Sequence, residues 1–213
     1  MAITVNAPSG KSPAPAPIST GSHVAICVSV IDIGTQISTY QGISKPQKKI
    51  ILTWEIASEI INVNGVDKPK VISREYTRSL AESSTLRAHL EAWRGKAFTA
   101  TELECFDLVN VLGAPCMLGV SHATKGDRTF ANIQAIMPVI KNIKIPDLYN
   151  DLLYFDLEDD TWESKYENLP VWLQNKISQS LEYKKLTQGN TLIQEKETVE
   201  DTSMYSDEGD LPF

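Results

Sequence analysis

Four alternating residues in the stretch 71–79 have the chemistry of a site for single-stranded nucleic acid. Ile72, Arg74, Tyr76 and Arg78 are two positions apart, so on a β-strand their side chains lie on one face. A tyrosine between two guanidinium groups can stack on a base while the cations contact neighbouring phosphates. We therefore predict a base-stacking role for Tyr76; the alternative is that Tyr76 is a packed residue of the sheet.

A second aromatic residue and several cations extend this pattern. In the stretch 128–137, Phe130 shares a face with Asn132 and Gln134, opposite more apolar residues. Phe130 can be a second stacking residue, or it can cover one end of the fold. Lysines also cluster near the expected loops, including Lys68. The predicted nucleic-acid site consists of Lys45, Lys48, Lys49, Lys70, Arg74, Tyr76, Arg78, Lys125, Arg128 and Phe130.

The last seven residues, Asp207–Phe213, form an acidic run with an apolar end. The terminal ring can fill an apolar pocket, its free carboxylate can pair with a cation, and the acids can steer the approach of a partner. The predicted partner-binding tip consists of Asp207, Glu208, Asp210, Leu211, Pro212 and Phe213.

Residues for catalysis or metal binding do not have a recognisable spacing. The three histidines and three cysteines are widely separated, so they predict neither a zinc site nor a disulfide framework. Gly10-Lys11-Ser12 lacks the glycine five residues earlier that a phosphate-binding loop requires. No nucleophile–base pair stands out. We therefore predict no enzyme, no cofactor and no metal.

The hydrophobic pattern predicts the elements that position these residues. Strands are expected at 23–33, 48–56, 71–79, 115–122 and 128–137. A helix is expected around 86–93, ending near Gly95, and Thr99-x-x-Glu102 has the spacing of a capping box. Trp54 shares a face with apolar residues and is assigned to the core. This order predicts a mainly β fold, the five-stranded oligonucleotide-binding Greek-key barrel with a helix between strands 3 and 4.

Composition divides the chain into four parts. Residues 1–20 are expected to be a flexible Pro/Ala-rich arm, and 21–145 the barrel. Residues 146–187 form an acidic segment with an amphipathic helix at 169–186 that packs on the barrel or mediates self-association. Residues 188–213 are expected to be a disordered acidic tail that ends in the tip.

Charge is segregated along the chain. Residues 1–145 carry 15 Lys+Arg and 11 Asp+Glu, whereas 146–213 carry 5 and 16. A mildly basic body with an acidic tail is typical of nucleic-acid-binding proteins, and equally of a soluble domain with a solvated tail. No apolar run approaches the ~20 residues of a membrane-spanning helix, and the N-terminus lacks a signal-peptide pattern. We predict no membrane association.

Two parts of the chain resemble known families. The tip resembles that of bacterial single-stranded DNA-binding proteins, in which it docks replication, recombination and repair enzymes and can compete with DNA. The body is similar to phage-encoded single-stranded DNA-binding proteins with an oligonucleotide-binding fold. The similar stretches are 23–25, 31–36, 90–96, 106–108, 169–173 and 180–183. The resemblance implies a phage protein in the cytoplasm of a bacterial host.

These observations together predict a sequence-independent single-stranded DNA-binding protein of phage DNA replication and recombination. Its tip would recruit replication, recombination and repair proteins, and self-association is left open. A rival interpretation is an interaction protein that mimics the host tip and sequesters repair enzymes without needing DNA. A third is an enzyme of phage DNA metabolism.

Overall fold

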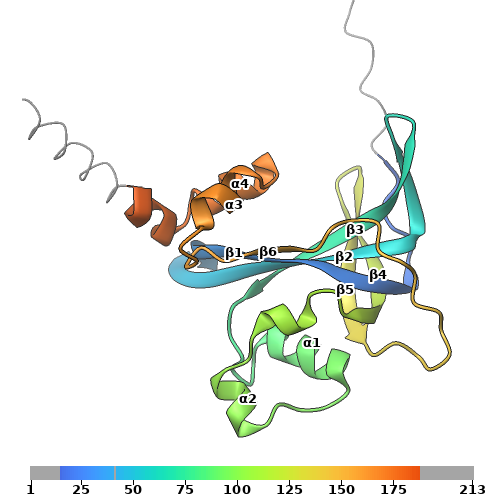
Figure 1. The fold of residues 1–213 in the computed structure, drawn as a ribbon, viewed down its shortest axis with the longest axis horizontal. Helices are drawn as coiled ribbons and strands as arrows, with labels where there is room; N and C mark the ends of the chain where they lie inside the picture. Colours follow the sequence, from blue (N-terminus) through green and yellow to red (C-terminus); the bar gives the residue numbers. More distant parts are fainter. Residues whose placement is uncertain (1–14, 41, 188–213) are drawn as a thin grey trace, which may run out of the picture.

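A five-stranded antiparallel sheet forms most of the computed structural model, which describes residues 15–40 and 42–187. The spatial order β3-β2-β1-β4-β5 curls into a nearly closed barrel (Figure 1). Its strands are β1 (Gly21–Tyr40), β2 (Ile43–Val63), β3 (Val66–Thr77), β4 (Pro115–Lys125) and β5 (Arg128–Met137). The short β6 (Leu153–Phe155) pairs with β1 in parallel. The mainly β, oligonucleotide-binding-type barrel predicted from the sequence is confirmed.

The long strand β1 holds the barrel together because it pairs with both halves of the sheet. Its residues 21–26 pair with β4, and its residues from Ile26 to Tyr40 pair with β2. Register shifts after Cys27 and Asp32 mark irregularities where the strand can bend. In the described part of the chain no backbone ladder joins β3 to β5. The Arg74 guanidinium instead donates a hydrogen bond to the Ile133 carbonyl of β5.

The predicted helical insert lies between β3 and β4. It comprises α1 (Thr85–Arg94), α2 (Ala100–Glu104) and the 3-10 turn η1 (Leu108–Val111), all below the sheet in Figure 1. Helix α1 ends at Gly95, whose φ of 67° is the left-handed conformation that favours glycine. The capping box of Thr99 and Glu102 is present at the start of α2. Both boundaries follow the sequence prediction.

The main core fills the space between the barrel and α1. Trp54 of β2 is fully buried, as predicted, and its ring centroid lies 6.0 Å from that of Trp93. The Trp93 indole donates to the Pro115 carbonyl at 2.9 Å. Leu90 of α1 and Leu118 of β4 are also fully buried, so the helix closes one end of the barrel.

The segment after residue 152 packs on the outer side of β1 and β2. Its helices α3 (Trp162–Glu167) and α4 (Val171–Ile177) lie on the opposite side of the sheet from α1 (Figure 1). A second cluster joins Ile31, Ile33 and Ile51 to the buried residues Phe155, Leu157, Leu169, Leu173 and Ile177. The predicted amphipathic helix therefore packs on the barrel, but it is shorter than expected, because α4 ends at Ile177 and helical structure resumes only at Leu181.

Polar contacts fix this segment against β1. The Thr35 amide and hydroxyl donate to the Glu182 carboxylate at 2.6 and 2.5 Å. At Gly34, where φ is 67°, a Cβ atom would lie 2.7 Å from the Ser180 Cβ atom, so glycine permits the close approach. Farther along β2, the buried Glu55 carboxylate accepts from the Tyr149 amide at 3.0 Å and the Asn150 amide at 2.9 Å.

The N-terminal boundary of the barrel differs from the prediction. Residues 15–20 were expected to belong to a flexible arm, but Ile18 is only 5% exposed and belongs to the main core. The His122 imidazole lies 2.7 Å from the Ile18 carbonyl, and His23 Nε2 lies 2.9 Å from the Ser19 carbonyl. A single buried isoleucine beside Pro17 was too weak a signal to extend the domain. Among residues 15–40 and 42–187, no helix is both long and apolar enough to cross a bilayer.

Candidate nucleic-acid interface

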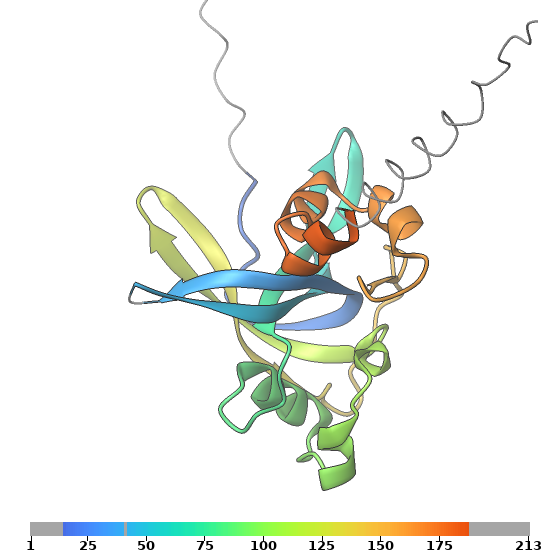
Figure 2. The same ribbon diagram turned by 90° about the vertical axis from the view of Figure 1, so that its left-hand side faces the viewer.

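A groove of about 610 Å³ lies between two protruding hairpins of the barrel. One wall is the β2–β3 hairpin, with Val63 and Lys68, and the other is the β4–β5 hairpin, with Phe130. The segment that starts at Pro15 runs between them, as the blue trace in Figure 2 shows. The groove follows the edge of β3 that has no strand partner among the described residues, and the Pro15–Ile18 segment forms part of its lining.

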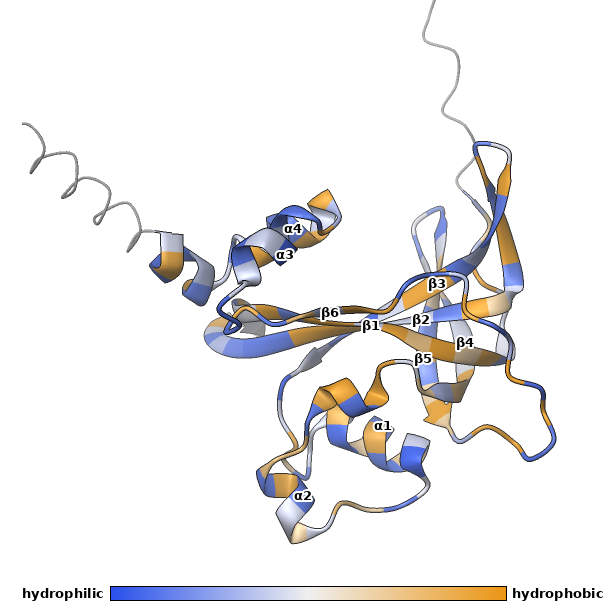
Figure 3. Ribbon diagram, viewed as in Figure 1, coloured by the Kyte–Doolittle hydropathy of each residue, from blue (hydrophilic) through white to orange (hydrophobic). Residues whose placement is uncertain are grey.

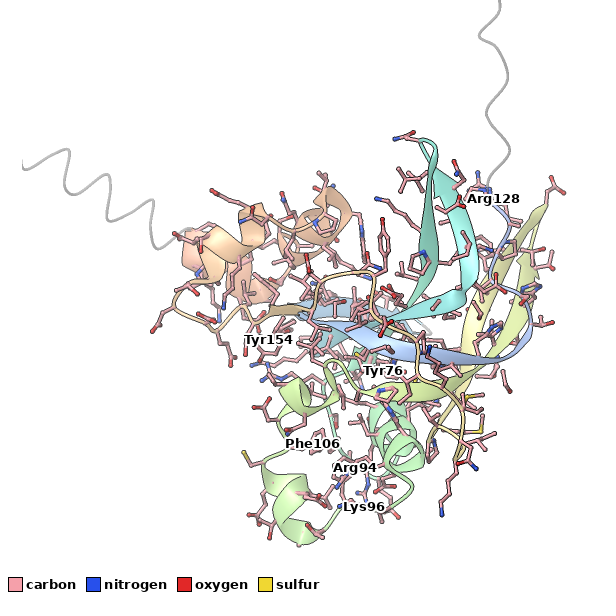
Figure 4. The ribbon with its side chains drawn as sticks, turned by 45° about the vertical axis from the view of Figure 1, so that its right-hand side comes forward. Tyr76, Arg94, Lys96, Phe106, Arg128 and Tyr154 are labelled. Carbon is pink, nitrogen blue, oxygen red and sulfur yellow. The ribbon has the colours of Figure 1, made fainter. Side chains whose placement is uncertain are left out.

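The β4–β5 hairpin presents an aromatic ring and two cations. Phe130 is 47% exposed and pairs across the ladder with Ala123, whose small side chain leaves the ring uncovered on that side. Lys125 and Arg128 face each other across the turn, and neither has an ion-pair partner among the described residues. Figure 4 labels Arg128 on the outside of the barrel. These three predicted site residues are therefore accessible together.

The opposite wall contributes a further cation. Lys68 is half-buried beside the groove, and its side chain makes no hydrogen bond or ion pair with the described part of the chain. Lys70, one of the predicted site residues, also lines the groove, but its ammonium is 3.0 Å from Glu59 and 3.3 Å from the Pro17 carbonyl. Lys70 therefore holds the Pro15–Ser19 segment in place, whereas Lys68 keeps its charge available.

Tyr76 is not a stacking platform in this structure. It is only 3% exposed, and its hydroxyl lies 2.9 Å from Nδ1 of His89 on α1. Burial raises the pKa of Tyr76 well above its ordinary value, and burial together with the nearby Arg74 lowers the pKa of His89. The face that Tyr76 shares with Ile72 is the interior of the barrel (Figure 4), so the alternative interpretation of Tyr76 as a packed residue is the correct one.

The two arginines next to Tyr76 have structural partners. Arg74 lies 5.4 Å above the Tyr76 ring and bridges to β5, so it closes the barrel. Arg78 pairs with the buried Asp32 at 2.8 Å. Removal of the Arg78 charge would leave that carboxylate without its ion-pair partner. Neither guanidinium is free for a phosphate, and the predicted triad on β3 is corrected.

The cations of the β1–β2 hairpin are separated from the groove. Lys48 is 2.6 Å from Glu158, and this hydrogen bond raises the pKa of Lys48. Lys49 lies 3.8 Å from Glu75, a carboxylate that it shares with Lys176 of α4. Lys45 is exposed near the hairpin turn and has no partner among the described residues, but it belongs to a different hairpin from Phe130.

The arrangement has the two components that binding of a single strand requires. An exposed ring offers a stacking surface. Lys68 in the groove, with Lys125 and Arg128 at the end of the β4–β5 hairpin, can neutralise phosphates. Lys68, Val63 and the Pro15–Ile18 segment line the groove but do not belong to the site predicted from the sequence. The spacing of lysines gave no information on which of them meet a carboxylate from a distant segment.

The two buried cysteines, Cys27 and Cys116, show no features of a reactive or metal-binding site. Burial raises the pKa of the Cys27 thiol to about 12 and raises that of Cys116 further. Protonated thiols are poor nucleophiles and poor metal ligands. No cluster of three or more potential metal ligands is found in residues 15–40 and 42–187.

Several predicted features fall outside the residues that the structure describes: the arm up to residue 14, the Gly10-Lys11-Ser12 motif, the acidic tail 188–213 and its tip Asp207–Phe213. Comparison with protein-family models and with curated proteins finds no match to this chain.

Proposed function

We propose that this protein binds single-stranded DNA without sequence preference in the groove between the β2–β3 and β4–β5 hairpins. Phe130 stacks on a base, and Lys68, Lys125 and Arg128 contact the phosphates on either side. The observation that carries this proposal is the exposed Phe130 ring beside two cations that have no partner in the described chain. Stacking and phosphate contacts do not distinguish one base sequence from another.

The fold supports the same proposal. Barrels with this strand order commonly bind oligonucleotides in the region of strands 2 and 3, next to the loop between strands 4 and 5. The groove lies there, between β3 and the β4–β5 hairpin. The outer face of β1 and β2, by contrast, is covered by the cluster that includes Phe155 and Ile177. The proposed strand path therefore follows the uncovered side of the barrel.

The biological setting is proposed from the sequence. The protein would act in phage DNA replication and recombination within the cytoplasm of a bacterial host. Its acidic tip, Asp207–Phe213, would recruit replication, recombination and repair proteins while the barrel holds the strand. No enzymatic step, cofactor or membrane contact is part of this proposal.

A binding assay tests the proposal. Fluorescence anisotropy of a labelled oligo-dT is measured with wild type, and an unlabelled mixed-sequence single strand and a duplex are used as competitors. We expect both single strands to compete similarly and the duplex to compete poorly. Absence of oligo-dT binding at low salt would refute the proposal.

One observation favours the rival function. Lys48, Lys49 and Arg78, which were expected to contact DNA, are all engaged with carboxylates. An interaction protein that mimics the host tip would need no free cations in the barrel. It would capture repair enzymes through Phe213 and would leave oligo-dT unbound, so the same assay separates the two functions.

A further inference from the structure

An exposed apolar segment follows the barrel. Eight large apolar residues between Met137 and Leu153 are more than a third exposed, and Ile140 reaches 63%. The segment links β5 to β6 and appears as orange bands alternating with blue in Figure 3. Exposed apolar side chains that gather in one segment often mark a binding site. This surface is not used by the proposed DNA groove.

The most exposed part of this segment combines apolar side chains with positive charge. We call Ile140–Ile145 the lysine–isoleucine loop. Its Lys141 and Lys144 are exposed and make no hydrogen bond or ion pair with the described residues. The Ile143 amide donates to the Ile140 carbonyl at 3.3 Å, and Asn142 has a φ of 69°, so the loop contains a defined turn. A partner for it needs apolar surface surrounded by carboxylates.

Such a surface exists elsewhere on the same chain. A cleft of about 510 Å³ lies between the interior of β1, the residues that follow β3, the α2–η1 connection and β6. Its apolar walls include Leu80, Leu103, Phe106 and Tyr154, and Figure 4 labels the last two. We call it the acid-rimmed cleft because its carboxylates are Asp32, Glu104, Asp107 and Asp156.

Three of these carboxylates have unbalanced charge. Asp32 pairs with Arg78, but Glu104, Asp107 and Asp156 form no ion pair in residues 15–40 and 42–187. Asp107 and Asp156 line the cleft together with Tyr154. Burial, followed by the charges of these two acids, raises the pKa of Tyr154. A nucleic acid would be repelled here, whereas an apolar side chain flanked by lysines would be attracted.

We propose that the lysine–isoleucine loop of one copy docks in the acid-rimmed cleft of a second copy of this chain. The isoleucines enter the apolar cleft, and Lys141 and Lys144 meet the carboxylates at its rim. In the single chain Ile140 and Ile145 remain exposed, so the chain's own cleft does not hold them. The two surfaces differ, so the contact is heterologous and each copy can bind two others.

Sedimentation velocity of the full chain without DNA tests this proposal. At low salt and from low micromolar to several hundred micromolar protein, the mean mass is expected to rise past that of a dimer. The loop variant Lys141→Glu/Lys144→Glu and the cleft variant Glu104→Lys/Asp107→Lys should each associate at least about tenfold more weakly, because like charges then face each other. Lys184→Glu/Lys185→Glu, which has the same charge change on exposed lysines elsewhere, should associate as wild type does.

Mixing the two weakened variants gives the decisive result. The reversed loop of one fits the reversed cleft of the other, and their unchanged surfaces also fit, so the mixture should regain wild-type association. The Asp107 carboxylate accepts a hydrogen bond from the Val109 amide, so its substitution can disturb the local fold. Glu104→Lys alone therefore serves as a second cleft variant, because the Glu104 side chain has no partner among the described residues. A monomeric wild type, a loop variant that associates normally, or a mixture that stays monomeric would each overturn the proposal.

Discussion

Substitution of Phe130 by alanine removes the proposed stacking surface while leaving the fold intact. The ring is 47% exposed and faces Ala123, so its loss should change the free energy of unfolding by no more than about 1 kcal/mol. Loss of one stacked base weakens binding by about 1–3 kcal/mol, which is about 5- to 150-fold in Kd. Phe130→Tyr should bind nearly as well as wild type because the π-face is retained.

The assay is anisotropy of labelled oligo-dT at fixed salt, with urea denaturation of each variant as the stability control. Trp172→Ala is the matched control, because Trp172 is 52% exposed on α4 and lies outside the groove. It should leave the Kd unchanged. If Phe130→Ala stays folded and binds as tightly as wild type, Phe130 does not stack on the strand and the groove is the wrong site.

Three further results are expected. Tyr76→Ala should lower the free energy of unfolding by about 3–5 kcal/mol, measured in urea, because it empties a buried aromatic site. Hydrogen bonds from the Ser19 hydroxyl and Lys70 lower the pKa of Glu59 to about 2. The stability that Glu59 contributes is therefore fully present above its unfolded pKa of about 4.3, and it is lost as the pH falls from there through about 2. In an acid titration followed by circular dichroism, Glu59→Gln should remove the pH dependence of unfolding that comes from this carboxylate. Deletion of Asp207–Phe213 should abolish capture of replication and repair proteins in a pull-down, while the affinity for oligo-dT stays equal or rises. Phe213→Ala should weaken the binding free energy of the partner by at least ~2 kcal/mol and leave DNA binding nearly unchanged.

The architecture was largely readable from the sequence. The β-branched run 23–33 lies within β1, and the capping box at Thr99 began α2 as expected. Local patterns sufficed because strand alternation and helix caps depend on nearby residues. The break after Ile177 was missed because Leu181 continues the apolar spacing of α4, although it is 37% exposed.

The site was less predictable because it depends on contacts between distant segments. A period of two correctly grouped Ile72, Arg74, Tyr76 and Arg78, but alternation alone does not say which face of a strand is inside. The partner of Lys48 is Glu158, which is 110 residues away in the sequence. It belongs to the segment 146–187, for which the sequence did not decide between packing on the barrel and self-association. Lys125, Arg128 and Phe130 remain accessible because they are at the tip of a hairpin, far from that segment.

The salt dependence of oligo-dT binding tests the central claim most directly. On single strands the slope of log Kobs against log salt is about −0.7 per phosphate neutralised. Lys125→Ala/Arg128→Ala should make this slope shallower by about 1.4, because two phosphate contacts are lost. Lys48→Ala, which removes a lysine paired with Glu158, should leave the slope unchanged. A wild-type slope near zero, or equal slopes for wild type and the double variant, would contradict the proposed groove.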